Sequence, residues 1–234
     1  MTVNAYYQNV RGLNGKAHLI LPVMSLPVYN LVLFTETWLA DGFNDGEIFL
    51  IDQYYVYRKD RSCNTSSKCT GGGGALIGVR KSLPSIHLPL FERTDLEMVW
   101  VKLEFKVAVY VGCAYLPGRA ISNAYLSFAK SLEDNIALIP DKEYQLLIIG
   151  DFNLPLINCL LQRDGSLTPT DYTLNDAQDL NAEIVHQTSC FELRQYNRFT
   201  NTNNRILDLV LLDFQPSAIS HSVHRTGGRS VPLS

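Results

Sequence analysis

Short apolar runs separated by turn residues recur along most of the chain, and this pattern constrains the fold more strongly than any other feature of the sequence. Segments with helical spacing lie between these runs, at 16–25, 122–138 and 174–189. Strands with occasional helices between them favour two packed sheets covered by helices over a parallel doubly wound sheet. The expected strands are 3–8, 31–35, 54–58, 75–79, 98–105, 107–115, 145–149 and 206–212.

The segment 98–115 has the clearest pairing signal. Val99, Val101 and Leu103 alternate with polar or aromatic residues. A short reversal follows at Phe105, and a second β-branched run completes the pair. We therefore expect an antiparallel hairpin in the middle of the chain.

The length and composition indicate one globular unit. A chain of 234 residues suits one large domain, and we treat 1–234 as a single domain. Hydrophobic residues make up 46% and charged residues 18%, which is enough apolar surface for a packed core and too little charge for a disordered tail. No stretch approaches the roughly 20 apolar residues of a membrane span, and the start of the chain has no secretory signal pattern. We expect an intracellular protein with no membrane association.

The charge and the cysteines limit the possible partners. The net charge of −3 argues mildly against a protein that holds DNA by surface charge alone. A cluster of carboxylates that binds a divalent cation makes the net charge of the whole chain more negative than the charge of the surface that faces the substrate. A local basic rim is therefore compatible with the negative net charge. The five cysteines are scattered without a CxxC spacing, which argues against a zinc site and favours a reducing compartment.

Four consecutive glycines, Gly71–Gly74, precede an expected strand. A glycine run can cradle a phosphate, but the Lys-Ser or Lys-Thr pair of a P-loop does not follow this one. A flexible lead-in to the strand is therefore favoured over nucleotide binding.

Polar side chains occur at the ends of several expected strands. These residues are Asn9, Glu36, and Asp151 with Asn153. Any one of them alone is more often a turn or cap residue, because Asn and Asp favour such positions for backbone reasons. Their coincidence at strand ends favours a shared site at one rim of a sheet sandwich.

The chemistry of these residues suits a metal-dependent hydrolase. Glu36 follows five core-like residues directly, so its carboxylate must be hydrated, paired or bound to a cation. Mg²⁺ prefers hard oxygen ligands, usually one or two carboxylates with water and substrate phosphate. Strand alternation directs Asp151 and Asn153 to one side if the strand continues through them. The aspartate can then activate water, and the amide can hold a phosphate oxygen.

Asp208 lies within the apolar segment 206–212, in the middle of an expected strand, where an unpaired acid is costly to bury. A histidine partner would stabilise Asp208 and would be held by it in one tautomer. The alternative is an ordinary strand-edge aspartate that faces solvent.

Seven blocks of sequence resemble the endonuclease/exonuclease/phosphatase superfamily, and most closely the apurinic-type endonuclease domain of LINE (non-LTR) retrotransposon polyproteins. They occur in the family's order across nearly the whole chain. The blocks are Gln8-Asn9-Val10-Arg11-Gly12-Leu13, Thr35-Glu36-Thr37-Trp38-Leu39, Tyr57-Arg58-Lys59-Asp60-Arg61, the glycines into Ala75-Leu76-Ile77, Tyr115-Leu116-Pro117, Gly150-Asp151-Phe152-Asn153, and Ile206-Leu207-Asp208-Leu209-Val210.

The resemblance implies a DNase I-like fold, which is a four-layer α/β sandwich of two packed, mainly antiparallel sheets flanked by helices. It implies a Mg²⁺-dependent endonuclease, with Mn²⁺ as an alternative cation, that nicks DNA and leaves the 3′ hydroxyl that primes reverse transcription. It also implies that DNA is the substrate, that a reverse transcriptase domain belongs to the same parent polyprotein, and that the protein acts in the nucleus.

Roles for the metal and water site follow from the same resemblance. Glu36 is similar to the family's metal-binding glutamate, and Asn9 is similar to the asparagine beside it. Asp151 matches the residue that activates water, and Asn153 matches the residue that steadies the phosphate.

The remaining roles concern phosphate and DNA contact. Tyr115 resembles the phosphate-contacting tyrosine, and Asp208 resembles the acid that orients the catalytic histidine. Arg11, Arg58 and Arg61 are basic residues of the matching blocks, and we expect them to contact DNA phosphates. Arg11 stands where apurinic-site repair enzymes of the superfamily carry an aspartate, which disfavours abasic-site repair as the function.

The chain departs from the family near its end. The family closes with a Ser-Asp-His block one strand after the position of Asp208, and no Asp-His pair follows Asp208 in this chain. The late histidines, His221 and His224, do not follow an aspartate. We therefore expect the C-terminal strand and the catalytic Asp-His block to be missing, at a cost of about 10²–10⁴-fold in rate.

Two alternatives to a DNA endonuclease stay open. The first is another phosphodiesterase or phosphatase of the superfamily, acting on inositol phosphates or sphingolipids, since the fold does not fix the substrate. The second is an inactive domain that only binds nucleic acid or a partner.

Overall fold

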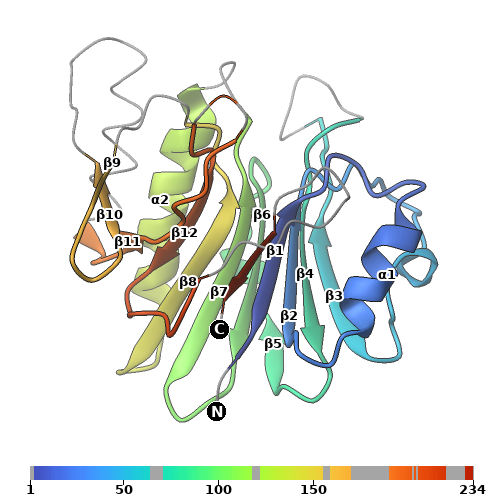
Figure 1. Ribbon diagram of the computed structural model, residues 1–234, viewed down its shortest axis with the longest axis horizontal. Helices are drawn as coiled ribbons and strands as arrows, with labels where there is room; N and C mark the ends of the chain where they lie inside the picture. The colour runs from blue at the N-terminus through green and yellow to red at the C-terminus, as the bar shows by residue number, and fades with distance from the viewer. Residues whose placement is uncertain are drawn as a thin grey trace.

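The computed structural model describes residues 3–63, 71–117, 122–154, 159–169, 190–201, 203, 205–219 and 230–233. Two β-sheets lie face to face in the middle of the molecule, and a helix covers the outer face of each (Figure 1). This order of layers confirms the expected four-layer α/β sandwich.

The first sheet has five strands in the order β13-β1-β2-β4-β3. β1 and β2 are parallel, and the other neighbouring strands are antiparallel. Helix α1 connects the parallel pair, because parallel neighbours need a long crossover. The elements are β1 (Ala5–Asn9), α1 (Ala17–Ser25), β2 (Leu31–Thr35), β3 (Tyr54–Lys59), β4 (Ala75–Arg80) and β13 (Ser230–Leu233).

The second sheet has eight strands in the order β5-β6-β7-β8-β12-β11-β10-β9. β7 and β8 are parallel and are joined by α2, and the other pairs are antiparallel. Both sheets are thus mainly antiparallel, as expected. The elements are β5 (Ser85–His87), β6 (Glu97–Leu103), β7 (Ala108–Tyr115), α2 (Ser122–Leu138), β8 (Tyr144–Asp151), β9 (Cys159–Leu161), β10 (Leu167–Pro169), β11 (Arg194–Gln195) and β12 (Asp208–Leu212), with short 3-10 turns η1 (Asp45–Glu47) and η2 (Pro89–Phe91).

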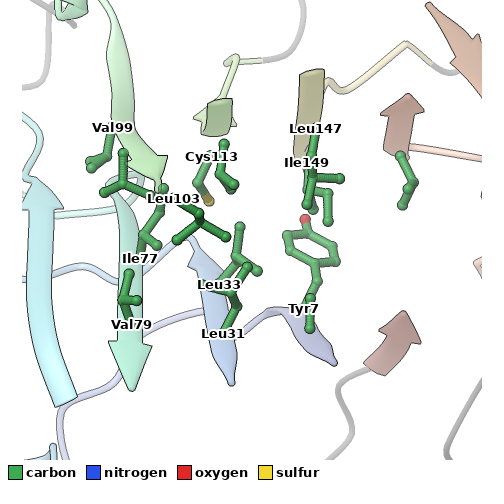
Figure 2. Packing of buried hydrophobic residues seen from close by; sticks show 14 of the residues in the cluster. Tyr7, Leu31, Leu33, Ile77, Val79, Val99, Leu103, Cys113, Leu147 and Ile149 are labelled. Carbon is green, nitrogen blue, oxygen red and sulfur yellow. The ribbon is translucent and has the colours of Figure 1, made fainter. Parts of the chain in front are cut away.

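The main core lies between the two sheets, where side chains of facing strands pack together (Figure 2). Val99, Val101 and Leu103 of β6 point toward the first sheet, whereas Trp100 points away and is buried under α2. The alternation predicted for this strand is confirmed. Both of its faces are buried because a helix covers the face that turns away from the other sheet.

Helix α1 covers the first sheet and buries Ile20, Val23 and Met24. It forms although Pro22 lies inside it and lacks the backbone N–H that this position would donate. Packing of an apolar face contributes most of the stability of a short helix, so the missing hydrogen bond is tolerated.

Helix α2 covers the second sheet and buries Tyr125, Phe128 and Leu132. Leu126, next to Tyr125 in the sequence, is 51% exposed. Successive helical residues lie about 100° apart around the helix axis, so Leu126 lies beside the buried face and not on it. No helix in the described part of the chain is long and apolar enough to cross a membrane.

Several strands differ from the expectation. Strands β5, β9, β10 and β11 have two or three residues each, too few to show an alternating pattern in the sequence. A strand not expected from the sequence, β13, pairs with β1 from Gln8 opposite Ser230 to Ala5 opposite Leu233. That the family's C-terminal strand and catalytic Asp-His block are missing stays a prediction. The helix expected at 174–189 lies outside the described residues.

The cysteines also depart from the simplest expectation. Cys63 is disulfide-bonded, so the cysteines are not all reduced. Cys113 is a free thiol buried between the sheets, and burial raises its pKa to about 12.

Candidate active site

Strand ends from both sheets meet at one edge of the sandwich. β1 and β2 are parallel and in register, so Glu36, which follows β2, emerges beside Asn9 at the end of β1. In the second sheet, Asp151 at the end of β8 lies opposite Tyr115 of β7 and Asp208 of β12. The topology therefore brings together five of the residues that the sequence singled out.

The Asn9 side chain links the two sheets at this edge. Its amide nitrogen Nδ2 donates one hydrogen bond to Glu36 Oε1 at 3.0 Å and another to Asp151 Oδ2 at 2.6 Å. Glu36 directly follows a strand of the first sheet, and Asp151 is the last residue of a strand of the second. One neutral amide thus fixes the spacing of two carboxylates that would otherwise repel each other.

Asp151 is the most buried carboxylate of the site, with 2% of its surface exposed. Burial raises its pKa well above the usual range, and the charges of Asp208 and Glu36 raise it further. The contacts that lower it come from the Asn153 backbone N–H, at 3.0 Å from Oδ1, and from Asn9. Both are neutral donors and do not offset these effects, so the ionised carboxylate of Asp151 is disfavoured until a nearby cation stabilises it.

Tyr7 is a site residue that the sequence did not reveal. Its hydroxyl donates to Asp208 Oδ1 at 2.6 Å and lies 2.8 Å from Thr35 Oγ1. Burial raises the pKa of this hydroxyl, and the charges of Asp208 and Asp151 raise it further. The hydroxyl therefore stays protonated and remains a donor. Figure 2 shows the ring among the core side chains of the facing sheets. A tyrosine in an apolar run cannot be distinguished from an ordinary core residue by sequence alone.

Asp208 differs from the sequence expectation in position. It is the first residue of β12 and therefore lies at the end of the strand, not in its middle. Its backbone carbonyl accepts a hydrogen bond from Asn197 Nδ2 at 2.6 Å, and its carboxylate accepts from Tyr7. The late histidines His221 and His224 lie outside the described residues.

Tyr115 places a phenol at the end of β7, next to the carboxylates. Burial raises its pKa to about 12, the charge of Glu36 adds to this rise, and Arg61 partly offsets it. The hydroxyl is therefore protonated at neutral pH and can donate a hydrogen bond to an anionic oxygen.

The alternation argument does not apply to Asn153, because the strand does not continue to this residue. The strand ends at Asp151, and Asn153 has a left-handed backbone with φ 48°. Its side-chain amide donates to the Leu116 carbonyl at 2.8 Å. The amide is thus held close to Asp151 by a turn, and its role with phosphate stays a prediction.

The three arginines expected to contact DNA have different surroundings. Arg58 lies 3.4 Å from Asp45 and 3.6 Å from Asp60, and Arg61 lies 2.8 Å from Glu97. Arg11 is exposed and lies two residues after Asn9. Arg11 is therefore the arginine of this group that is most open to a substrate.

Unusual backbone conformations concentrate at this edge. Non-glycine residues with positive φ include Arg11 at 47°, Glu36 at 53°, Trp38 at 55° and Asn153 at 48°. Such conformations cost of order 1–3 kcal/mol each and persist where the surroundings enforce them, which is common at functional sites. Trp38 is 44% exposed, so the turn after Glu36 presents an aromatic face at the rim.

The residues present fit a hydrated divalent cation. Within the described ranges, no three His, Cys, Asp or Glu side chains gather closely enough to hold a metal ion by themselves. Mg²⁺ does not need such a cluster, because one or two carboxylates suffice when water and phosphate complete its shell. Glu36 is only partly buried, and its Oε2 accepts no hydrogen bond from the described part of the chain. That oxygen is open to a cation.

A separate cavity of about 610 Å³ lies at the opposite end of the sandwich. Its walls include Ala5 at the start of β1, Gln145 near the start of β8 and Leu212 at the end of β12. None of the expected site residues lines it, so it is not the candidate active site.

Comparisons with known proteins bear on the fold. No protein-family model matches the chain, and no curated protein is similar to it in sequence. Among solved structures, the endonuclease domain of TRAS1, a telomere-specific non-LTR retrotransposon, has 14% identity and a TM-score of 0.63, covering 99% of this chain and 97% of that one. An AP endonuclease from Leishmania major has 12% identity and a TM-score of 0.67, with 99% and 86% covered.

A third neighbour is a 3′ phosphatase, NExo, from Neisseria, bound to a product DNA hairpin. It has 8% identity and a TM-score of 0.61, with 100% and 99% covered. At these identities the likeness shows the fold alone. The chain has the DNase I-like sandwich of the endonuclease/exonuclease/phosphatase proteins, as its sequence blocks predicted.

Proposed function

We propose that this protein is a Mg²⁺-dependent endonuclease that hydrolyses a phosphodiester bond of DNA and leaves a 3′ hydroxyl. The observation that carries the proposal is the Asn9 amide, which joins Glu36 of one sheet to Asp151 of the other. A cation ligand and a candidate base for water are thereby held at a fixed spacing, next to the Tyr115 hydroxyl.

Glu36 and Asn9 would hold the cation. Mg²⁺, or Mn²⁺ in its place, supplies positive charge for the phosphate oxygens when it is bound. The fixed amide and carboxylate positions mean that little reorganisation is needed when substrate arrives.

Asp151 is the proposed base for the attacking water. Hydrogen bonds from the Asn9 side chain and from the Asn153 backbone orient its carboxylate and stabilise the ionised form. Asp208, which lies opposite Asp151 in β12, is itself fixed by the Tyr7 hydroxyl. A correctly placed base contributes about 10²–10⁴-fold to the rate.

Tyr115 is the proposed donor to a phosphate oxygen. Its hydroxyl is protonated at neutral pH because burial and Glu36 raise its pKa to about 12. A fixed neutral donor stabilises charge that develops on the phosphate without adding a competing charge. The Asn153 amide is proposed to act in the same way, after it exchanges its contact with the Leu116 carbonyl.

DNA is the proposed substrate because of the rim of the site. Arg11 is exposed there, and Trp38 presents an aromatic surface that is 44% exposed. An exposed arginine and an exposed aromatic ring near the same site suit a phosphate backbone and its bases. As further proposals, a reverse transcriptase domain shares the parent polyprotein, extends the 3′ hydroxyl, and acts with this domain in the nucleus.

A nicking assay on supercoiled plasmid tests the function. We expect Mg²⁺-dependent conversion to the open circle and extension of the nick by a DNA polymerase, which requires a 3′ hydroxyl. Glu36→Ala should abolish nicking, whereas Glu133→Ala, on the exposed side of α2, should not. Equal nicking by the Glu36 variant would refute the metal site.

The same preparation distinguishes the alternative hydrolases. One solved neighbour is named as a 3′ phosphatase, so release of inorganic phosphate from 3′-phosphorylated DNA is the competing activity to measure. Phosphate release without plasmid nicking would favour a phosphatase. Binding of DNA without either activity would favour an inactive remnant.

A further inference from the structure

The four glycines before β4, which we expected to form a flexible lead-in, form a loop with hydrogen bonds to neighbouring segments. Their φ angles are 76°, 77°, 61° and 90° for Gly71–Gly74, a region of backbone space that favours glycine. The Gly74 N–H donates to Glu97 Oε2 at 2.6 Å, and the Gly73 carbonyl accepts from the Trp38 N–H at 2.9 Å. The loop is therefore tied to both sheets.

This loop wraps a buried ion pair. Arg61 Nε donates to Glu97 Oε1 at 2.8 Å, and the two side chains are 10% and 1% exposed. Arg61 follows β3 of the first sheet, and Glu97 begins β6 of the second. With Gly74 on the other oxygen, both oxygens of the carboxylate are satisfied, as a buried charge requires.

The glycines leave the space that the pair occupies. A Cβ at Gly73 would collide with the Glu97 carboxylate and the Arg61 guanidinium. A Cβ at Gly72 would come within 2.9 Å of Arg61 Nη1. Gly72 and Gly73 are thus explained by the ion pair, and a Cβ at Gly74 would collide with Thr37 Oγ1 instead.

The ion pair and the glycine loop around it contact the candidate active site in two places, at Tyr115 and at the turn after β2. The Arg61 guanidinium lies 5.4 Å from the centre of the Tyr115 ring, and Glu97 pairs directly with Tyr115 across β6 and β7, so both side chains share one face. The hydrogen bond from Trp38 to Gly73 fixes the turn that carries Glu36.

We propose that Arg61, Glu97 and Gly71–Gly74 form a positioning clamp that holds the Tyr115 hydroxyl and the Glu36 turn in place. Arg61 acts through Tyr115 and does not contact DNA phosphate, which revises the role that its sequence block implied. The catalytic meaning of the clamp rests on the proposed nuclease function, but its structural basis does not.

The burial of Arg61 favours positioning over DNA contact. The Arg61 side chain is 10% exposed, its Nε donates to Glu97 and its Nη1 donates to the Gly71 carbonyl at 3.3 Å, so a phosphate would compete with these contacts for the guanidinium. Removing one partner of a buried pair is strongly destabilising. Replacing a residue that neutralises a phosphate lowers the salt dependence of DNA binding, by a slope of about 0.9 for each phosphate concerned.

Arg61→Met and Glu97→Gln test the clamp by three measurements. These are kcat and KM for nicking, the salt dependence of DNA binding without metal, and the ¹⁹F NMR signal of Tyr115 in fluorotyrosine-labelled protein, assigned with Tyr115→Phe. We expect each variant to lower kcat about 10²-fold with little change in KM, because small misplacements have effects of this size. The Tyr115 signal should shift. The salt slope, which is the slope of the logarithm of the DNA-binding constant against the logarithm of the salt concentration, should stay unchanged.

Lys102→Met is the matched control. Lys102 pairs with Asp141 at 2.9 Å and lies 5.6 Å from the Tyr110 ring, so it repeats the cation, carboxylate and tyrosine arrangement away from the site. It should leave kcat and the Tyr115 signal unchanged. Arg61→Lys is the second variant if Arg61→Met does not fold. It should shift the Tyr115 signal because lysine lacks the planar guanidinium group of arginine.

The outcomes separate the clamp from the function. A salt slope reduced by about 0.9 in Arg61→Met, with kcat and the Tyr115 signal unchanged, would overturn the clamp and restore a phosphate contact. An unchanged signal in Arg61→Lys also counts against it. If the unmodified protein does not nick DNA, the proposed function fails, and the NMR shift still decides whether the clamp exists.

Discussion

Replacing Asn9 by alanine is the sharpest perturbation of the candidate site. The change removes the donor to buried Asp151 and to half-buried Glu36. A hydrogen bond to a charged group contributes about 1.5–3 kcal/mol to stability. The bond to Glu36 is the more exposed of the two, so we place its contribution at the lower end of this range. Because water can enter from the open side, we expect a net loss of about 2 kcal/mol.

This loss predicts both a stability change and a rate change. For a chain of this length, about 2 kcal/mol corresponds to a fall in Tm of roughly 4–8 °C. The two carboxylates also lose their common anchor, and we expect kcat for plasmid nicking to fall about 10²-fold. Thermal unfolding measures the change in stability. Nicking at a temperature well below the Tm of the unmodified protein and of the variant measures the change in rate separately.

Asn135→Ala is the matched control. Asn135 is also a buried asparagine, and its Nδ2 donates to the Phe91 carbonyl at 2.9 Å and to Ser131 Oγ at 3.3 Å, under α2 and away from the site. It should lower Tm and leave kcat unchanged. If Asn9→Ala nicks within about threefold of the unmodified protein while folded, the Asn9 link does not organise the site.

Individual side chains give three further predictions. Tyr7→Phe removes the donor to Asp208 and should lower the free energy of unfolding by about 1–3 kcal/mol in a urea titration; an unchanged midpoint would contradict this. Tyr115→Phe should lower kcat by a constant factor from pH 7 to 10, because a hydroxyl with a pKa of about 12 stays protonated throughout; a factor that varies with pH would argue against a neutral donor. The Cys113 thiol, with a pKa of about 12, should not react with a thiol reagent at pH 8 until urea unfolds the protein, and rapid labelling of the folded state would show that it is accessible.

The sequence predicted the part of the site that depends on strand ends. Asn9, Glu36 and Asp151 each terminate an apolar run, and strands in one sandwich bring such ends to a common edge. For Asn153 the alternation argument lost its basis, because alternation holds only while a strand continues and β8 stops at Asp151.

Other features depend on contacts between segments far apart in the sequence. Tyr7 joins the site through Asp208, which lies 201 residues later, and nothing in the run around it reveals that partner. The Gly71–Gly74 run gave no indication of Glu97, which it encloses. The short edge strands and β13 form because a neighbouring strand offers free backbone groups, and their own residues show little β pattern.

The most direct test of the central claim is Mg²⁺-dependent nicking of supercoiled plasmid by the unmodified protein and by Asp151→Ala. Asp151 is the carboxylate that Asn9 links to the proposed cation ligand. We predict nicking that requires Mg²⁺ and that falls at least about 10²-fold in the variant. Equal nicking by the two proteins, or none by the unmodified protein, would contradict the assignment of this edge as a nuclease centre.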